Sequence, residues 1–300
     1  QEGRVPMPST LRGAAACVLL LLAVGLPLFG QAVKPVKVLV IADLEGVDGV
    51  FNFDLQCIPF KSPLYPESRK ALTNEVKAAV EGIEDGANHR ARVVVYDNHY
   101  GGHNLSSLDM PSGVKLLSGS PVSPTLGLDA SYSAIMFVGL HSMAGTKDGV
   151  LPHSFTWNIQ NIWVNGTKAG EIGSRVMLGG ELGIPAVMLA GDAAACREYL
   201  ALVPQGECAQ VKTGESHTGG YSLTDADACA LIKAKAEDAI THLAEIKPYA
   251  MHGPAEVKAE FTNEANPSFP AGPGVEQTDG RTWVFRGPDF IHAWLKFRTF

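Results

Sequence analysis

Two carboxylates stand two residues apart directly after a buried apolar run. Asp43 and Glu45 follow the β-branched stretch 36–41, which predicts a buried strand. Side chains two apart in an extended chain point to the same side, so both carboxylates are expected in one small volume. Carboxylates that close repel each other, and a bound cation removes the repulsion. Gly46 lets the chain turn away. The spacing favours a metal site, although a polar strand end with Asp43 as a helix cap would show the same pattern.

Later apolar runs also end on polar residues that could bind a metal. They are 91–96, followed by Asp97-Asn98-His99; 134–140, followed by His141; and 184–190, followed by Gly191-Asp192. Runs of this kind predict parallel strands, and in open parallel sheets sites form beyond the carboxyl ends of the strands. We therefore expect these side chains to meet the first carboxylate pair at one edge of a sheet.

A set of nitrogen and oxygen ligands follows from this arrangement. Its members are Asp43, Glu45, His99, His141 and Glu171, the last at the start of a predicted helix over 172–182. Imidazole with carboxylate suits zinc, and also manganese, cobalt or iron. Five ligands exceed the three protein ligands usual for one catalytic zinc, so two metals that share a carboxylate match the count better. His103, four residues after His99, competes with it, and spacing alone leaves that choice open.

Two loop histidines remain outside this set. His153, in Leu151-Pro152-His153-Ser154, is a candidate catalytic residue, although a loop histidine is more often solvated. His217 has an exposed loop as its default interpretation. The sequence contains no phosphate-cradling glycine loop, no GxSxG elbow and no HExxH helix, so metal chemistry is the strongest signal.

The apolar periodicity predicts the elements that position these residues. Strand 36–41, helix 67–87 and strand 91–96 form a right-handed βαβ unit with a parallel sheet. Asn165-Gly166 predicts a hairpin between 156 and 170. Further predicted elements are a helix at 225–246, strands at 254–261 and 281–286, and a helix at 290–297. The expected fold class is α/β, a mostly parallel, Rossmann-like sheet with helices on both faces in residues 33–210, plus a smaller C-terminal α+β region in 211–300.

The composition and the N-terminal segment limit the possible cellular location and binding partners of the protein. The chain has 300 residues, 46% of them apolar, and a net charge of -7, which argues against a nucleic-acid partner. Arg4 and Arg12 precede an apolar run at 14–29. Gly30-Gln31-Ala32 follows this run and places small residues at the two positions that a signal peptidase recognises. This pattern predicts a signal peptide over 1–32 and a secreted or periplasmic protein. A membrane anchor is the alternative, but it needs about 20 apolar residues, so we expect no stable anchor.

The cysteine count fits an oxidising compartment. Cys57, Cys196, Cys208 and Cys229 follow the predicted signal peptide, and an even number permits disulfides. Cys196 and Cys208 are the first pair to consider because they are close in sequence. Ordinary buried thiols explain the count equally well.

From about Val36 to the C-terminus the chain resembles the DppA-type zinc-dependent D-aminopeptidase family. The motifs that carry the resemblance are Asp43-Leu44-Glu45-Gly46, Asp97-Asn98-His99, Gly139-Leu140-His141, Leu151-Pro152-His153-Ser154, Asn165-Gly166 through Gly170-Glu171-Ile172-Gly173, and Ala190-Gly191-Asp192. The resemblance implies two zinc ions held at Asp43, Glu45, His99, His141 and Glu171, with Asp43 bridging. It selects His99 over His103, makes His153 the proposed nucleophile, and implies a decamer of two stacked five-membered rings.

These patterns together predict an exported di-zinc aminopeptidase that forms a homo-oligomer. Its substrates are expected to be short peptides with an N-terminal D-amino acid, such as D-Ala-D-Ala. The export signal departs from the cytoplasmic members of the family, and the aromatic segment 52–66 is longer than usual. Two alternatives remain: an exported metal- or peptide-binding protein without catalysis, and a di-metal hydrolase of another amide or ester bond. Phosphate substrates would favour Arg or Lys near the site, and none stands beside the five ligands in sequence.

Overall fold

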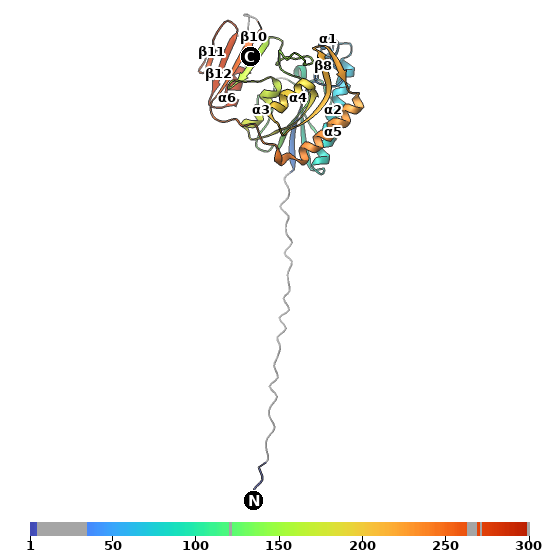
Figure 1. Ribbon diagram of the computed structural model, residues 1–300, viewed down its shortest axis with the longest axis vertical. Coiled ribbons are helices and arrows are strands. Elements are labelled where there is room, and N and C mark those ends of the chain that lie inside the picture. Colours follow the sequence, from blue (N-terminus) through green and yellow to red (C-terminus); the bar gives the residue numbers. More distant parts are fainter. Residues whose placement is uncertain (5–34, 120–121, 263–268, 271, 299–300) are drawn as a thin grey trace. The chain divides into compact units, whose positions relative to one another are not determined.

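A computed structural model describes residues 1–4, 35–119, 122–262, 269–270 and 272–298 (Figure 1). Residues 35–300 form one compact unit. The predicted signal peptide lies outside the described residues except for its first four. Among the helices that the structure describes, none combines the length and the apolar character that a membrane crossing requires.

A seven-stranded sheet forms the centre of this unit. Its strands are β1 (Val36–Ala42), β2 (Ala91–Asp97), β3 (Lys115–Leu117), β4 (Ala134–Leu140), β7 (Ala186–Asp192), β8 (Glu207–Ser216) and β9 (Gly219–Ser222). Their order is β3-β2-β1-β4-β7-β8-β9, and every pair is parallel except β8 with β9. Every residue of β4 and β7 is buried, as their unbroken apolar runs predict.

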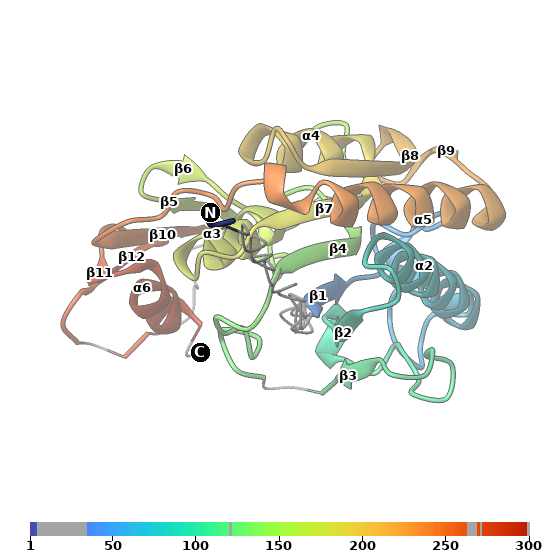
Figure 2. The ribbon, with the colours of Figure 1, turned by 90° about the horizontal axis from the view of Figure 1, so that it is seen from below.

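Helices cover both faces of this sheet, which confirms the predicted fold class (Figure 2). The crossover from β1 to β2 runs toward one edge through α2 (Tyr65–Gly86), whereas the crossover from β4 to β7 runs toward the other through α3 (Glu171–Glu181). Because such crossovers are right-handed, the two helices lie on opposite faces. The helix α5 (Asp225–Thr241) packs beside α2, and α4 (Ala193–Leu202) packs beside α3.

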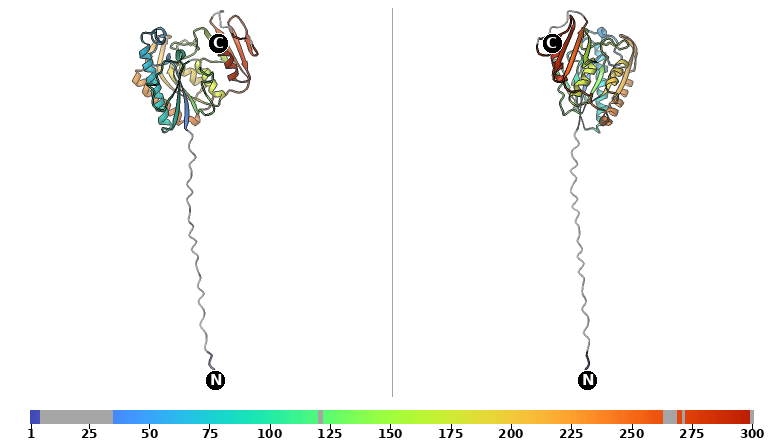
Figure 3. Two further views of the ribbon diagram at one scale, coloured as in Figure 1. Left: turned by 180° about the vertical axis from the view of Figure 1, so that it is seen from behind. Right: turned by 60° about the vertical axis from the view of Figure 1, so that its left-hand side comes forward.

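A second, antiparallel sheet contains five strands. They are β5 (Ile159–Val164), β6 (Thr167–Lys168), β10 (Ala255–Phe261), β11 (Val275–Gln277) and β12 (Thr282–Gly287), in the order β11-β12-β10-β5-β6. Asn165 and Gly166 have φ of 47° and 81°, the left-handed values that the predicted hairpin turn requires. The helix α6 (Phe290–Phe297) packs on β10 and β12, and it also contacts α3 of the main sheet (Figure 3).

The division between the two regions differs from the one predicted. The predicted boundary between residues 210 and 211 falls inside β8, and α5, placed in the second region, packs on the main sheet. The hairpin β5–β6, placed in the first region, pairs with β10. The second sheet is therefore built from two segments far apart in sequence. Alternation of apolar residues identifies strands but carries no information on which distant strand each one joins.

Several elements were not predicted, and one cysteine pairing that the sequence left open is formed. The missed elements are α1 (Phe53–Gln56), a 3₁₀ turn η1 (His99–Gly101), β3, α4, β8, β9 and β11. The predicted helix 225–246 ends earlier, with a separate 3₁₀ turn η2 (Leu243–Glu245). Cys196 and Cys208 form a disulfide that joins α4 to β8, while Cys57 and Cys229 are free thiols.

Candidate active site

The carboxyl ends of β1, β2 and β4 lie side by side, so the residues that follow them meet. Gly46 makes this approach possible: its backbone N–H donates to the carbonyl of Gly139 at 2.7 Å, and a Cβ at position 46 would overlap the carbonyl oxygen of Leu140. Gly139 has φ of 73°, and a Cβ there would overlap the backbone of Asp43. Two glycines therefore bring the loop after β1 into direct contact with the end of β4.

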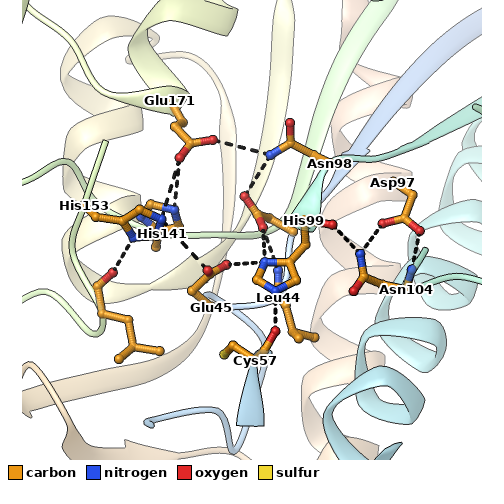
Figure 4. Close-up of polar contacts among 12 residues, drawn as sticks. Leu44, Glu45, Cys57, Asp97, Asn98, His99, Asn104, His141, His153 and Glu171 are labelled. Atoms are coloured by element: carbon orange, nitrogen blue, oxygen red, sulfur yellow. Dashed lines mark hydrogen bonds and ion pairs between the residues drawn. The ribbon is translucent and has the colours of Figure 1, made fainter. Parts of the chain in front are cut away.

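All six site residues predicted from the sequence come together at this edge (Figure 4). They are Asp43, Glu45, His99, His141, His153 and Glu171, and each is buried. Figure 4 shows His141, His153 and Glu171 on one side of the cluster and His99 with Asn98 on the other. His103 and His217 are exposed and lie outside the cluster. The choice of His99 over His103 agrees with this geometry.

Short distances join the histidines to the carboxylates. Nδ1 of His99 lies 3.2 Å from Oδ1 of Asp43 and 3.1 Å from Oε2 of Glu45. Nε2 of His141 lies 3.5 Å from Oε1 of Glu171. Nε2 of His153 lies 3.9 Å from Oε1 of Glu45 and 4.0 Å from Oε1 of Glu171. Two overlapping groups have their ligand atoms within 4.8 Å of one another: Asp43, Glu45 and His141, and His141, His153 and Glu171.

Backbone carbonyls fix the tautomer of each imidazole. The bonds are His99 Nε2 to the carbonyl of Cys57 (2.7 Å), His141 Nδ1 to the carbonyl of Ser142 (3.0 Å) and His153 Nδ1 to the carbonyl of Leu151 (2.9 Å). A carbonyl only accepts, so these nitrogens carry the protons. The opposite nitrogen of each ring therefore faces the carboxylates and becomes a metal ligand when it gives up its proton. Metal-binding histidines are oriented by this kind of bond.

The charges of the cluster are consistent with a metal centre. Burial and the charge of Glu45 raise the pKa of Asp43 to about 7. Burial raises the pKa of Glu171, but the close contact with His141 and the charges of His141, His153 and Arg175 together outweigh burial and lower the pKa to about 2. The same contact raises the pKa of His141 to about 10 against the effect of burial. Nε2 of His141 is buried with no hydrogen-bond partner among the described residues. A buried imidazole nitrogen that lacks a partner and faces carboxylates is a suitable ligand for a metal cation.

Asn98, which directly follows β2, orients two of the carboxylates. Nδ2 of Asn98 donates to Oδ2 of Asp43 at 2.9 Å and to Oε2 of Glu171 at 3.4 Å. Its own Oδ1 accepts from Nη2 of Arg175 at 3.4 Å. Asn98 stood in the predicted motif without a role. Arg175 corrects the sequence-based expectation that no cation stands near the ligands: it lies one helical turn after Glu171 and contacts the site through Asn98.

A buried lysine holds the loop that carries Glu45. Nζ of Lys212, on β8, donates to the carbonyls of Glu45 (2.5 Å), Val47 (2.8 Å) and Val50 (2.5 Å). Lys212 lies on a strand three places from β1 in the sheet order, and nothing in its local sequence indicated that it belongs to the site. Asp192, at the end of β7, is not in the cluster: it caps α4 by accepting from the backbone N–H of Ala195.

Strained backbone flanks His153. Leu151 and Phe155 have φ of 50° and 61°, values that non-glycine residues rarely adopt. The carbonyl of Leu151 holds His153, and the backbone N–H of Phe155 donates to Oε1 of Glu171 at 2.8 Å. Backbone strain of this kind concentrates at functional sites. Here both strained residues orient members of the cluster.

A parallel α/β sheet that gathers imidazoles and carboxylates at its carboxyl edge has the architecture of a metal-dependent hydrolase. The D-aminopeptidase family profile matches residues 36–299, and the chain belongs to the D-aminopeptidase family. The chain is thus a metallo-aminopeptidase, and the family resemblance inferred from the motifs is confirmed.

Two similar proteins come from one organism. The D-aminopeptidase of Bacillus subtilis (strain 168) is 28% identical over 263 residues, which cover 86% of this chain and 94% of that protein. The solved structure described as "Zn-dependent D-aminopeptidase DppA from Bacillus subtilis, a self-compartmentalizing protease" superposes with a TM-score of 0.79 at 26% identity. That match covers 87% of this chain and 95% of the other.

Proposed function

We propose that this protein is an exported, zinc-dependent D-aminopeptidase that removes the N-terminal D-amino acid from short peptides such as D-Ala-D-Ala. The observation that carries the proposal is the buried cluster in which a backbone carbonyl holds one nitrogen of each imidazole and the other nitrogen faces carboxylates. Zinc is favoured over other metals because the similar solved protein is described as zinc-dependent.

Five residues would hold two zinc ions: Asp43, Glu45, His99, His141 and Glu171. Asp43 is the candidate shared ligand, since it contacts His99 and also belongs to the group with Glu45 and His141. Bound zinc would supply polarisation of the scissile carbonyl and neutralise developing negative charge.

His153 is proposed to act on the substrate itself. Its Nδ1 proton is held by the carbonyl of Leu151, so Nε2 is the atom that attacks or that accepts and returns a proton. This nitrogen faces Glu45 and Glu171 at 3.9 and 4.0 Å and lines a cavity of about 250 Å³. Burial and the neighbouring His141 lower the pKa of His153, which favours the neutral ring that either role needs.

Export and assembly complete the proposal. The Cys196–Cys208 disulfide supports an oxidising compartment, in line with the predicted signal peptide over 1–32 and a secreted or periplasmic location. The similar solved protein is described as self-compartmentalizing, which supports a homo-oligomer here, with a decamer as the expected size. The mass of the purified protein, measured by light scattering, tests that size.

Substitution of His153 tests catalysis against simple binding. The chain from Val33 is loaded with zinc, and metal content and D-Ala-D-Ala hydrolysis are measured for the wild type, His153→Ala and His217→Ala. The expected result is two zinc ions per subunit in all three, with turnover reduced about 10²–10⁴-fold only in His153→Ala. His217 is the matched control because it is an exposed histidine outside the cluster. A wild type that binds metal and peptide but turns over no faster than His153→Ala would support the binding-protein alternative.

A further inference from the structure

Four aromatic side chains other than histidine line the catalytic cavity; Phe155 packs against Trp294 of α6, and the other three form a separate group. Phe53 from α1, Tyr100 from η1 and Trp157 from the loop before β5 line the same 250 Å³ cavity as the carboxylates. Trp157 is 52% exposed and Tyr100 is 58% exposed. Large apolar side chains that stay exposed together indicate a binding surface. The three residues are called the aromatic rim below.

The aromatic rim continues directly from the catalytic histidine. The ring of Trp157 stacks on that of His153 at 4.6 Å with an angle of 26°. Phe53 meets Trp157 edge-on at 5.3 Å and 90°, and its ring lies 6.4 Å from that of His99. An apolar group that leaves the reacting centre would therefore pass along a continuous ring surface.

Tyr100 closes the other side of the rim. Its ring lies 5.9 Å from that of His99. Its backbone is left-handed, with φ of 47° and ψ of 40°. A tyrosine in this conformation is strained, so the surrounding fold imposes its position.

The charges of the cavity exclude some side chains from this rim. The only acids that line the cavity are the ligand candidates Asp43, Glu45 and Glu171, and no Lys or Arg lines it among the described residues. A charged substrate side chain at the rim would lose water without gaining a partner, which is unfavourable. An apolar side chain would gain free energy by burial against the rings.

The geometry also indicates which substrate residue reaches the rim. Aminopeptidase chemistry puts the amino group and the scissile carbonyl near Nε2 of His153, at the buried end of the cavity. The whole cavity, rim included, has a volume of about 250 Å³, below the roughly 300–1,000 Å³ of common small-molecule sites, so the part beside the carboxylates suits a small first residue. The second residue, on the leaving side, then points outward. We propose that Phe53, Tyr100 and Trp157 form a subsite for an apolar, preferably aromatic side chain on the second residue of the substrate. This inference rests on the proposed D-aminopeptidase function.

Phe53 and Trp157 also line a second hollow, next to the catalytic cavity. A space of about 360 Å³ lies beyond Phe53 and Trp157, which line it together with Asn52, Asp54, Leu151, Pro152, His217 and Thr218. The two rings are thus a partition between the catalytic cavity and this hollow. Replacing Trp157 with alanine would join the two spaces and remove the surface that recognises the second residue.

The test compares kcat/KM for four dipeptides with the zinc-loaded chain: D-Ala-D-Phe, D-Ala-D-Ala, D-Ala-D-Glu and D-Phe-D-Ala. We expect D-Ala-D-Phe to exceed D-Ala-D-Ala by at least about tenfold, and the other two to be poorer than D-Ala-D-Ala. In Trp157→Ala the ratio of kcat/KM for D-Ala-D-Phe to that for D-Ala-D-Ala should fall to about three or less. In Trp157→Phe most of the wild-type ratio should remain. The ratio cancels any general loss of turnover from the lost stacking on His153. Tyr221→Ala, which removes a 71% exposed aromatic residue outside this cavity, is the control and should keep the ratio.

Four results would overturn the inference, and the last of them would overturn the proposed function as well. Hydrolysis of D-Ala-D-Ala as fast as D-Ala-D-Phe would show that the rim does not select the second residue, and the proposed function would stand. A preference for D-Phe-D-Ala would assign the rim to the first residue instead. A Trp157→Ala ratio equal to that of the wild type would remove Trp157 from recognition. Failure to cleave any of the four dipeptides would overturn the proposed function itself, and the subsite with it.

Discussion

Replacement of Lys212 with methionine should weaken both the fold and the metal site. Lys212 is 2% exposed, and its ammonium group is the shared donor for the carbonyls of Glu45, Val47 and Val50. Methionine preserves most of the apolar stem but removes every donor. The loop that carries Glu45 would then contain three buried carbonyls without their partner.

The size of the effect follows from these three bonds. A buried polar group left unsatisfied costs about 1–3 kcal/mol, so three of them set a range of about 3–9 kcal/mol. Burial lowers the pKa of Lys212 to about 8, which shows that keeping the ammonium buried already costs free energy. Water that enters beside the shorter side chain also replaces some bonds. We therefore expect a loss of about 3–4 kcal/mol, which at roughly 2–4 °C per kcal/mol lowers Tm by about 6–16 °C.

Urea unfolding and zinc titration measure the two effects. Zinc affinity should fall at least about tenfold, the lower end of what loss of a supporting contact costs. Lys235→Met is the matched control, because Lys235 forms a half-exposed ion pair with Glu207 that contributes at most about 1 kcal/mol. If Lys212→Met and Lys235→Met had equal stability and equal zinc affinity, the supporting role of Lys212 would be refuted.

Three further predictions address other parts of the fold. Burial and the nearby charge of Asp48 raise the pKa of Glu75 well above its usual 4.5, so the folded chain keeps a proton that the unfolded chain releases, and stability falls as the pH rises through the folded pKa. Glu75→Gln should remove this dependence, so its Tm falls less than that of the wild type between pH 5 and 8; an identical pH profile would contradict it. The double variant Cys196→Ser with Cys208→Ser should lower the free energy of unfolding, measured in urea, by about 3 kcal/mol. Cys229→Ser, which removes a free thiol, is the control, and an equal loss in both variants would contradict the structural role of the disulfide. Chelation should lower the Tm measured by calorimetry, and added zinc should restore it, because the buried carboxylates then lack their cation; a Tm unaffected by chelator would argue against a metal at this cluster.

Strand ends were the part of the site most accessible from sequence. Apolar runs fixed β1, β2 and β4, and parallel strands must place their carboxyl ends at one edge, so Asp43, His99 and His141 could be brought together by reasoning alone. Spacing could not choose between His99 and His103. The family resemblance selected His99, but neither it nor any local pattern predicted the left-handed turn at Tyr100 that follows this histidine.

Contacts between distant segments were the part that sequence could not supply. Lys212 lies 167 residues along the chain from Glu45, whose carbonyl it holds. Arg175 is connected to the carboxylates through its hydrogen bond to Asn98. Trp157 falls within the hairpin predicted between 156 and 170, yet it lies before β5 and stacks on His153. Such pairings are set by tertiary packing, and no local pattern of apolar and polar residues records them.

Hydrolysis of D-Ala-D-Ala against L-Ala-L-Ala is the most direct test of the proposed function. The chain from Val33, loaded with zinc, is incubated with each dipeptide, and released alanine is measured. The account predicts cleavage of the D-dipeptide and little or none of the L-dipeptide. Cleavage of both at similar rates would contradict the stereochemistry while retaining the metallo-aminopeptidase. Absence of cleavage of either, with two zinc ions bound per subunit, would contradict the proposed activity.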